Sequence, residues 1–315
     1  MGLRGINKTE ANLDHARIVA AVGVSGHDVT YGRRTLEDEM YIIEAEALKA
    51  LLGERHDVCV LDARRPEEMA AGVIPGAQPI DLYDAMLVGS DKTSVEAYAG
   101  AAAAACRAAG VANDARIVVY EASSGIRAAR AVWTLIWLGH PQVFILNGGL
   151  EAWVAIGGSI SAPGNAKAQG SFEAHRRDEV FITANEIAGR LQDGQMRLLD
   201  VRGSDEFLGT DEPDCDPRPG RIPCASWLYW RKLESQGRFC RDEVVGAVLT
   251  TQAITSDQEV VVYCHRGARS AYVWLALRKA GVRVRNYLGS WHEWSRREHL
   301  PACVGEPDAL LNRRA

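Results

Sequence analysis

The feature of this sequence that most constrains its fold is an internal repeat. Four blocks occur twice along the 315 residues, each time in the same order, and four matches in one order are hard to obtain by chance. The repeat predicts two copies of one domain. The paired blocks are VCVLDARRPEEM and MRLLDVRGSDEF, GVIPGA and GRIPCA, RIVVYEASSGIRAARAVW and EVVVYCHRGARSAYVW, and LNGGLEAW and LGSWHEW.

Each copy alternates short Val-rich runs with amphipathic helical segments. That alternation is typical of an α/β fold in which helices cover both faces of a parallel β-sheet. The Gly-, Ala- and Ser-rich stretch between the copies lacks apolar periodicity and reads as a linker. The predicted division is an N-terminal extension (1–40), a first domain (41–158), a linker (159–178), a second domain (179–301) and a C-terminal tail (302–315).

Composition excludes several classes of protein. A net charge of −5 gives no general attraction to nucleic acid or to an anionic membrane, so neither is an expected partner. The seven cysteines form no C-x-x-C pair and are odd in number, which argues against a disulfide framework or a structural zinc site. The cysteine spacing also means that no bound metal is expected. We find no apolar run long enough to span a bilayer and no secretory signal, and we therefore expect a cytoplasmic protein.

One cysteine stands in surroundings unlike those of the other six. Cys264 directly follows the strand EVVVY, at the sheet edge where α/β proteins bind ligands. The loop that follows carries Arg266, Gly267 and Arg269 and leads into a helix, so backbone amides and positive charge converge on the sulfur. Such surroundings favour a nucleophilic thiolate.

A cysteine that follows a strand is more often a small core residue. Two arginines within five positions weigh against that interpretation here, whereas Cys59 and Cys106 lie in apolar runs and are expected in the core. The remaining four cysteines lie in irregular polar stretches with nothing to indicate chemistry. They are Cys215, Cys224, Cys240 and Cys303.

The chain resembles the tandem-domain rhodaneses, a family of sulfurtransferases. The resemblance covers nearly all of the chain after residue 40 and is most specific in four motifs. These are Asp200-x-Arg202 with Glu206-Phe207, the turn 220–225, the loop from Cys264 to Arg269-Ser270, and Gly289-Ser290-Trp291.

The resemblance implies that Cys264 is the catalytic nucleophile. It would take the sulfane sulfur from a small-molecule donor, hold it as a persulfide and pass it to a thiophilic acceptor, with no cofactor. The acceptor can be a small molecule or a thiol-bearing protein, and the chain is expected to be a monomer or a dimer. The persulfide would be bound by the backbone of His265, Arg266, Gly267, Ala268, Arg269 and Ser270.

In the first copy Glu121 occupies the position of the cysteine. A carboxylate cannot carry sulfane sulfur, so the first domain is expected to be catalytically silent, as the resemblance to tandem members also implies. Arg127 and Arg130 follow Glu121 and could reach a shared cleft, although a solvated place on the helix is the expectation.

Thiosulfate is the expected donor, because Arg266 and Arg269 form a pair suited to a small dianion. If Arg269 instead holds the loop, only Arg266 faces the substrate. Arg218 or Arg221 could supply a further cation or lie on a turn surface, and Trp227 and Trp230 could line the pocket or lie in the core. Asp200 and Arg202 are expected to pair at the strand end.

Four other functions were considered. They are transfer from 3-mercaptopyruvate, whose enzymes typically have an uncharged loop, a persulfide carrier for a partner protein, a phosphatase and a metal site. A phosphatase loop has one residue more between its cysteine and arginine than the four between Cys264 and Arg269. A metal site on Cys264 and His265 is disfavoured because adjacent residues rarely bind one ion.

Overall fold

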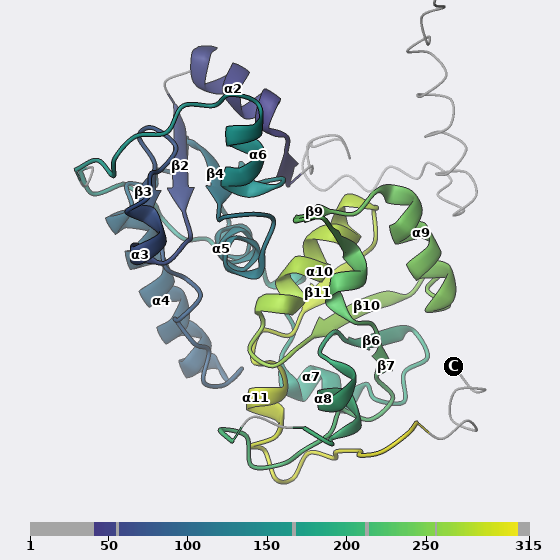
Figure 1. The fold of residues 1–315 in the computed structure, drawn as a ribbon. Coiled ribbons are helices and arrows are strands. Elements are labelled where there is room, and N and C mark those ends of the chain that lie inside the picture. The colour runs from purple at the N-terminus through teal and green to yellow at the C-terminus, as the bar shows by residue number, and fades with distance from the viewer. Residues whose placement is uncertain (1–40, 55–56, 166–167, 212–213, 256, 308–315) are drawn as a thin grey trace, which may run out of the picture.

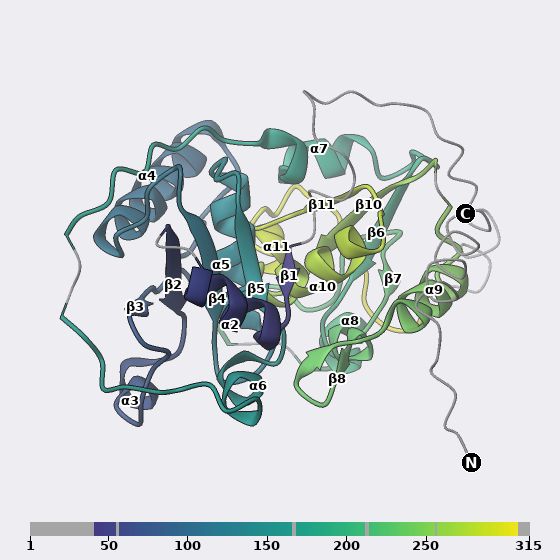
Figure 2. The same ribbon diagram turned by 90° about the horizontal axis from the view of Figure 1, so that it is seen from above.

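The computed structural model describes residues 41–54, 57–165, 168–211, 214–255 and 257–307, and these form two α/β domains (Figures 1 and 2). The predicted extension (1–40) and the end of the predicted tail (308–315) lie outside the described residues. Among the described residues, no helix combines the length and the apolar character needed to cross a bilayer.

The first domain is built on five parallel strands in the order β1-β5-β4-β2-β3. The strands are β1 (Ile42–Ile43), β2 (Val58–Asp62), β3 (Gln78–Pro79), β4 (Arg116–Tyr120) and β5 (Val143–Leu146). The helices between them are α2 (Ala45–Glu54), α3 (Pro66–Met69), α4 (Lys92–Ala108), α5 (Ile126–Trp137) and α6 (Gly149–Ala155).

The second domain repeats this topology with four parallel strands in the order β11-β10-β6-β7. Phe181 pairs in parallel with Asn286 at the position that β1 takes in the first sheet. The strands are β6 (Met196–Asp200), β7 (Ser226–Trp227), β10 (Glu259–Tyr263) and β11 (Val284–Asn286). The remaining elements are α7 (Ala184–Gly189), α8 (Ser204–Leu208), α9 (Asp242–Thr251), α10 (Ala268–Lys279), α11 (Ser290–Trp294), the 3-10 turns η2 (Asp178–Val180) and η3 (Trp230–Leu233), and the hairpin β8 (Glu234–Ser235) with β9 (Arg238–Phe239).

Both faces of each sheet are covered, so the predicted α/β class with two domains is confirmed. In β2, Val60 packs toward α2 and α6, whereas its neighbour Leu61 packs toward α4 and α5. In β10, Val261 packs toward α7, α8 and α11, whereas Val262 packs toward α10. Burial on both faces explains why the strands read as continuous apolar runs rather than alternating ones.

The two domains share one apolar core. Helices α5 and α10 lie next to each other between the two sheets (Figure 2) and pack against each other. Trp133 and Trp137 of α5 and Trp274 of α10 are fully buried in the same cluster. The matching tryptophans of the repeat, Trp133 and Trp274, therefore belong to one cluster to which both domains contribute.

Paired charges fix the end of an inner strand in each copy, β6 in the second domain and β2 in the first. Arg202 donates through Nε and Nη2 to the Asp200 carboxylate at 3.0 and 2.7 Å, and both side chains are fully buried. Arg64 and Asp62 repeat this arrangement in the first domain. The predicted pairing of Asp200 with Arg202 is confirmed, and its role is to hold the strand end in place.

The described part of the stretch predicted as a linker runs along the first domain. Phe172 is buried beside His140, and the backbone N–H of Gly170 donates to the Arg107 carbonyl at 2.8 Å.

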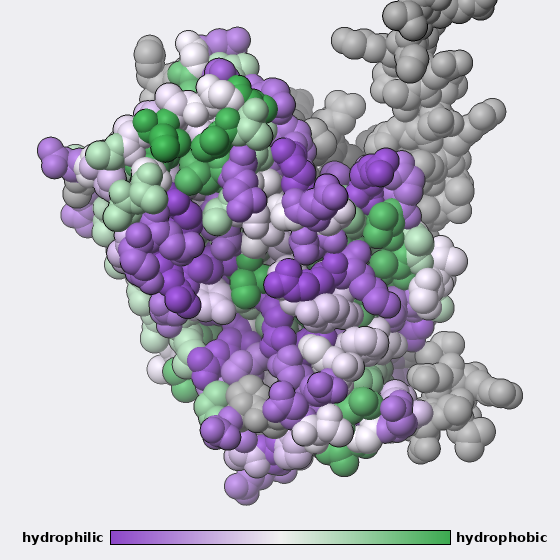
Figure 3. All heavy atoms as spheres, in the orientation of Figure 1, coloured by the Kyte–Doolittle hydropathy of each residue, from purple (hydrophilic) through white to green (hydrophobic). Residues whose placement is uncertain are grey.

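Elsewhere on the first domain, Leu150 and Val154 line a shallow hollow, and apolar side chains gather over α6 in Figure 3. The rest of that face is mostly hydrophilic.

Candidate active site

Cys264 follows β10 directly and lies at the carboxyl end of the second sheet. Its side chain is 1% exposed. The Gly267 N–H donates to the sulfur at 3.1 Å, and the Ser270 hydroxyl lies 3.6 Å from it. Helix α10 begins at Ala268, so its N-terminus faces the thiol as the sequence predicts.

The environment of Cys264 favours the thiolate. Burial acts to raise the pKa of this thiol, but the charge of Arg269 and hydrogen bonds from Ser270 and the Arg266 backbone act against it. The net result is a pKa below the usual value for a cysteine. A buried thiol with a lowered pKa is suited to nucleophilic attack near neutral pH.

The loop backbone depends on a glycine. Gly267 has a φ of +82°, in the left-handed region. A Cβ added there would lie 2.7 Å from the Leu288 carbonyl oxygen. Only glycine satisfies both conditions, and its amide is the one that donates to the cysteine.

Ser290 supports the cysteine from the other side, a role that we did not assign from the sequence. The Cys264 N–H donates to the Ser290 hydroxyl oxygen at 3.1 Å, and that hydroxyl donates to the Tyr287 carbonyl at 2.7 Å. The repeated block that ends in Gly289-Ser290-Trp291 was the available signal. The repeated block indicated that this segment matters, but it did not predict the hydrogen bond from Cys264.

Arg269 is committed to the loop structure. Its guanidinium binds the Glu206 carboxylate through two hydrogen bonds of 2.5 and 2.8 Å. This contact agrees with the alternative in which Arg269 holds the loop, and it weighs against a site in which Arg266 and Arg269 together face a dianion. The charge of Arg269 still acts on the pKa of Cys264.

The side chains of Arg266 and His265 meet a segment that the sequence did not mark. Arg266 Nη2 lies 3.2 Å from the sulfur of Cys215, and His265 Nε2 lies 2.9 Å from the Asp216 carboxylate. Our interpretation that Cys215 has no chemical surroundings is wrong. It failed because Cys215 lies 49 positions before Cys264, so only the folded chain brings it to the loop.

Arg130 reaches the active loop from the first domain. It is 1% exposed and donates to the backbone carbonyls of Arg266 and Ala85. The predicted solvated position is therefore wrong for Arg130, because the packing of α5 against α10 buries it. Arg127 stays within its own domain, where it donates to the Ala63 carbonyl at 2.8 Å.

The other candidate cations and aromatic residues are structural. Arg218 donates to carbonyls around the end of α11, including Ser295 at 2.8 Å, and Arg221 is buried and donates to the Gly305 carbonyl at 2.6 Å. Neither is the turn-surface residue or the substrate cation considered above. Trp227 donates to the Arg202 carbonyl at 2.9 Å, and Trp230 packs edge-on against Tyr272.

Glu121 fills the equivalent position of the first domain. Its Oε1 accepts hydrogen bonds from the N–H groups of Arg127 (3.0 Å) and Ala128 (3.1 Å), at the N-terminus of α5. Glu121 lines a pocket of about 480 Å³ together with Trp230 and Gly237 of the second domain. The carboxylate occupies the backbone cradle that would otherwise receive a sulfur.

Burial raises the pKa of Glu121 from 4.5 to about 7, although the two amides and Arg127 act to lower it. The folded state thus binds this proton more tightly than the unfolded state. The free energy of unfolding should therefore fall as pH rises from about 5 to 7, by up to about 3 kcal/mol. In Glu121→Gln, whose amide oxygen still accepts both N–H groups, this pH-dependent loss should be absent in urea titrations.

A matched control is Glu243→Gln, which changes an exposed carboxylate in the first turn of α9. It should keep the wild-type decline in stability between pH 5 and 7. A Glu121→Gln protein with an unchanged decline would show that another group causes it.

Comparison with known proteins agrees with this geometry. The model of the rhodanese-like domain matches residues 44–156 and 183–297. The sulfur carrier protein TtuD of Thermus thermophilus is 32% identical over 252 residues, which cover 75% of this chain and 86% of that protein. A probable 3-mercaptopyruvate sulfurtransferase of Pseudomonas aeruginosa is 34% identical over 206 residues, or 62% of this chain and 70% of that protein.

A solved structure gives the same result. The crystal structure of a probable thiosulfate sulfurtransferase superposes with a TM-score of 0.66 at 31% identity, covering 80% of this chain and 99% of the other. Both halves of the repeat match the same domain model, and the Pseudomonas aeruginosa relative and the solved structure carry sulfurtransferase names. The chain therefore belongs to the rhodanese family of sulfurtransferases, as a member with two rhodanese-like domains in tandem.

Proposed function

We propose that the protein transfers the sulfane sulfur of thiosulfate, through a persulfide on Cys264, to a thiophilic acceptor such as cyanide or a thiol. The observation that carries this proposal is the buried thiol of lowered pKa, which accepts a hydrogen bond from Gly267 at the N-terminus of α10. The family supports the reaction class, and the loop supports the residue.

The chemistry needs no cofactor. The Cys264 thiolate attacks the outer sulfur of thiosulfate, a new S–S bond forms, and the old S–S bond breaks with its electron pair leaving on sulfite. The acceptor then attacks the outer sulfur of the persulfide, and the thiolate is regenerated. No proton has to be removed once the thiolate exists, so His265 needs no role as a general base.

The residues from His265 to Ser270 are proposed to bind the persulfide. Their amides and the end of α10 direct partial positive charge at the sulfur. Arg269 would hold this cradle in shape through Glu206. That commitment also counts against a phosphatase, where the closing arginine must bind the substrate oxyanion.

Positive charge beside the loop supports thiosulfate as the donor. Arg296 pairs with the Asp216 carboxylate, whereas Arg266 lies against the sulfur of the neighbouring Cys215. Arg266 is the cation nearest the cysteine in sequence that is not committed to a carboxylate among the described contacts. We propose that it binds the sulfonate group of thiosulfate and leaves Cys215 when it does so.

The test is to compare kcat/KM for thiosulfate and for 3-mercaptopyruvate, with cyanide as acceptor, and to measure the intact mass before and after each donor. Preference for thiosulfate, with one sulfur atom gained, is the expected result. Preference for 3-mercaptopyruvate would overturn the proposed donor but would leave the proposed persulfide mechanism in place.

The variant that probes the donor site is Arg266→Ala. It should raise KM for thiosulfate about tenfold while changing the rate with a neutral organic trisulfide much less, since a neutral donor gains little from the charge. Arg283→Ala removes an exposed arginine directly before β11, at the amino ends of the strands and thus away from Cys264. It should leave the rates with both donors unchanged. Equal effects of Arg266→Ala on both donors would refute its electrostatic role.

A persulfide carrier is the second candidate, favoured by the similarity to the sulfur carrier protein TtuD. A carrier would accept sulfur from a partner protein rather than from a small donor. Absence of sulfur gain from either small donor, in a protein whose Cys264 reacts with an alkylating reagent, would favour this function over the first.

A further inference from the structure

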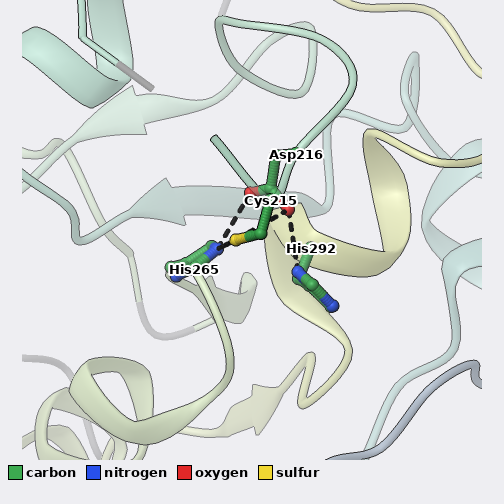
Figure 4. Close-up of side chains that lie close together, drawn as sticks. All are labelled: Cys215, Asp216, His265 and His292. Atoms are coloured by element: carbon green, nitrogen blue, oxygen red, sulfur yellow. Dashed lines mark hydrogen bonds and ion pairs between the residues drawn. The ribbon is translucent and has the colours of Figure 1, made fainter. Parts of the chain in front are cut away.

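Four side chains with metal-binding atoms gather beside the Cys264 loop. They are Cys215, Asp216, His265 and His292 (Figure 4). They come from three parts of the chain, namely the segment before β7, the loop after β10 and helix α11. One sulfur, one carboxylate oxygen and two imidazole nitrogens all lie within 4.8 Å of one another.

The distances come close to those of a tetrahedral site. His265 Nε2 and His292 Nδ1 lie 2.9 and 2.7 Å from the two oxygens of Asp216, and His265 Nε2 lies 3.8 Å from the Cys215 sulfur. Bonds of about 2.0 to 2.3 Å to a tetrahedral zinc ion place ligand atoms about 3.3 to 3.5 Å apart. Small side-chain movements would therefore suffice to enclose an ion.

We propose that these four residues bind a divalent cation of the zinc class. A thiolate and two imidazoles suit zinc or cobalt, whereas magnesium and calcium prefer oxygen ligands. This set differs from the Cys264 and His265 pair dismissed from the sequence, because the fold supplies three further ligands to His265. Cys264 is not among them.

Arginine side chains take the place of the cation in the protein without metal. Arg296 Nη1 lies 2.8 Å from Asp216 Oδ1 and 2.9 Å from His292 Nδ1, so one guanidinium nitrogen bridges two ligand atoms that lie only 2.7 Å apart. Arg266 lies in the same way against Cys215. The Asp216 side chain is fully buried and thus requires a positive partner.

Metal and arginine therefore compete for the same atoms. The Arg296 side chain is 38% exposed and can turn into solvent when a metal enters. Replacing Arg296 by glutamine removes this competing charge, so it should tighten metal binding about tenfold or more.

The experiment is a titration of the full chain with Co²⁺ under a phosphine reductant, in a Cys264→Ser background that removes the catalytic thiol. One equivalent of Co²⁺ should bind and produce a thiolate-to-cobalt charge-transfer band together with the visible bands of a tetrahedral site. Zn²⁺ should displace the cobalt and abolish both. Because the background carries no catalytic thiol, the result does not depend on the proposed sulfur transfer.

Two further cysteine variants locate the site. Cys215→Ser in the same background should lose the charge-transfer band, whereas Cys224→Ser, at another exposed cysteine, should keep it. Failure of stoichiometric Co²⁺ binding, a band that persists in Cys215→Ser, or unchanged affinity in Arg296→Gln would overturn the proposal and leave the cluster as an ion-pair network.

Discussion

Cys264→Ser should lower the rate of sulfur transfer by more than about a thousandfold with every donor, because a hydroxyl at that position supplies no thiolate and cannot form a persulfide. The fold should persist, since serine differs from cysteine by one atom and the Gly267 N–H can donate to its oxygen. Thiocyanate formation measures the rate, and intact mass after addition of donor measures the persulfide.

The matched control is Cys224→Ser, which alters an exposed cysteine and should keep both the rate and the gain of sulfur. An active Cys264→Ser enzyme, or sulfur gained at another cysteine, would refute the proposed mechanism. Circular dichroism of both variants separates a chemical effect from loss of structure.

Gly267→Ala should reduce both activity and stability. The backbone at residue 267 has a left-handed φ that alanine disfavours, and the new Cβ would also clash with the Leu288 backbone, so the loop must move and its amide must leave the sulfur. We expect a loss of about 2 to 4 kcal/mol in the free energy of unfolding. A displaced cradle should lower kcat/KM about a hundredfold.

Gly281→Ala separates the two causes. Gly281 also has a positive φ, of +78°, but an added Cβ would meet nothing within 4 Å. This variant should lose about 1 kcal/mol of stability and keep full activity, because the backbone strain is present without the clash. A Gly267→Ala protein that behaves like Gly281→Ala would show that the loop tolerates a side chain and that the cradle is not rigid.

The sequence was informative where neighbours in the chain are also neighbours in space. The repeat predicts the two sheets, and Cys264 lies at the end of a strand because the run EVVVY ends there. Gly267 and Ser270, which contact the sulfur of Cys264, lie only 3 and 6 positions after it in the sequence. The replacement of the cysteine by Glu121 likewise predicts a silent first domain without reference to any other segment.

Contacts between distant segments could not be predicted from the sequence in the same way. Glu206 lies 63 positions from its partner Arg269, and Arg130 lies 136 positions from the Arg266 carbonyl that it binds. The residues next to an arginine in the sequence do not indicate whether its side chain contacts solvent, a substrate or a buried carbonyl. The choice among these depends on how helices pack, which periodicity alone does not determine.

The shared core of α5 and α10 has a consequence for any attempt to shorten the protein. Trp133 and Trp137 belong to the first domain, yet they help to bury the same cluster as Trp274 of the second domain. An isolated catalytic half would expose that cluster to water and would lose Arg130 from the active loop. The first domain, which we expect to be catalytically silent, thus acts as a permanently attached subunit that completes the apolar core of the second domain.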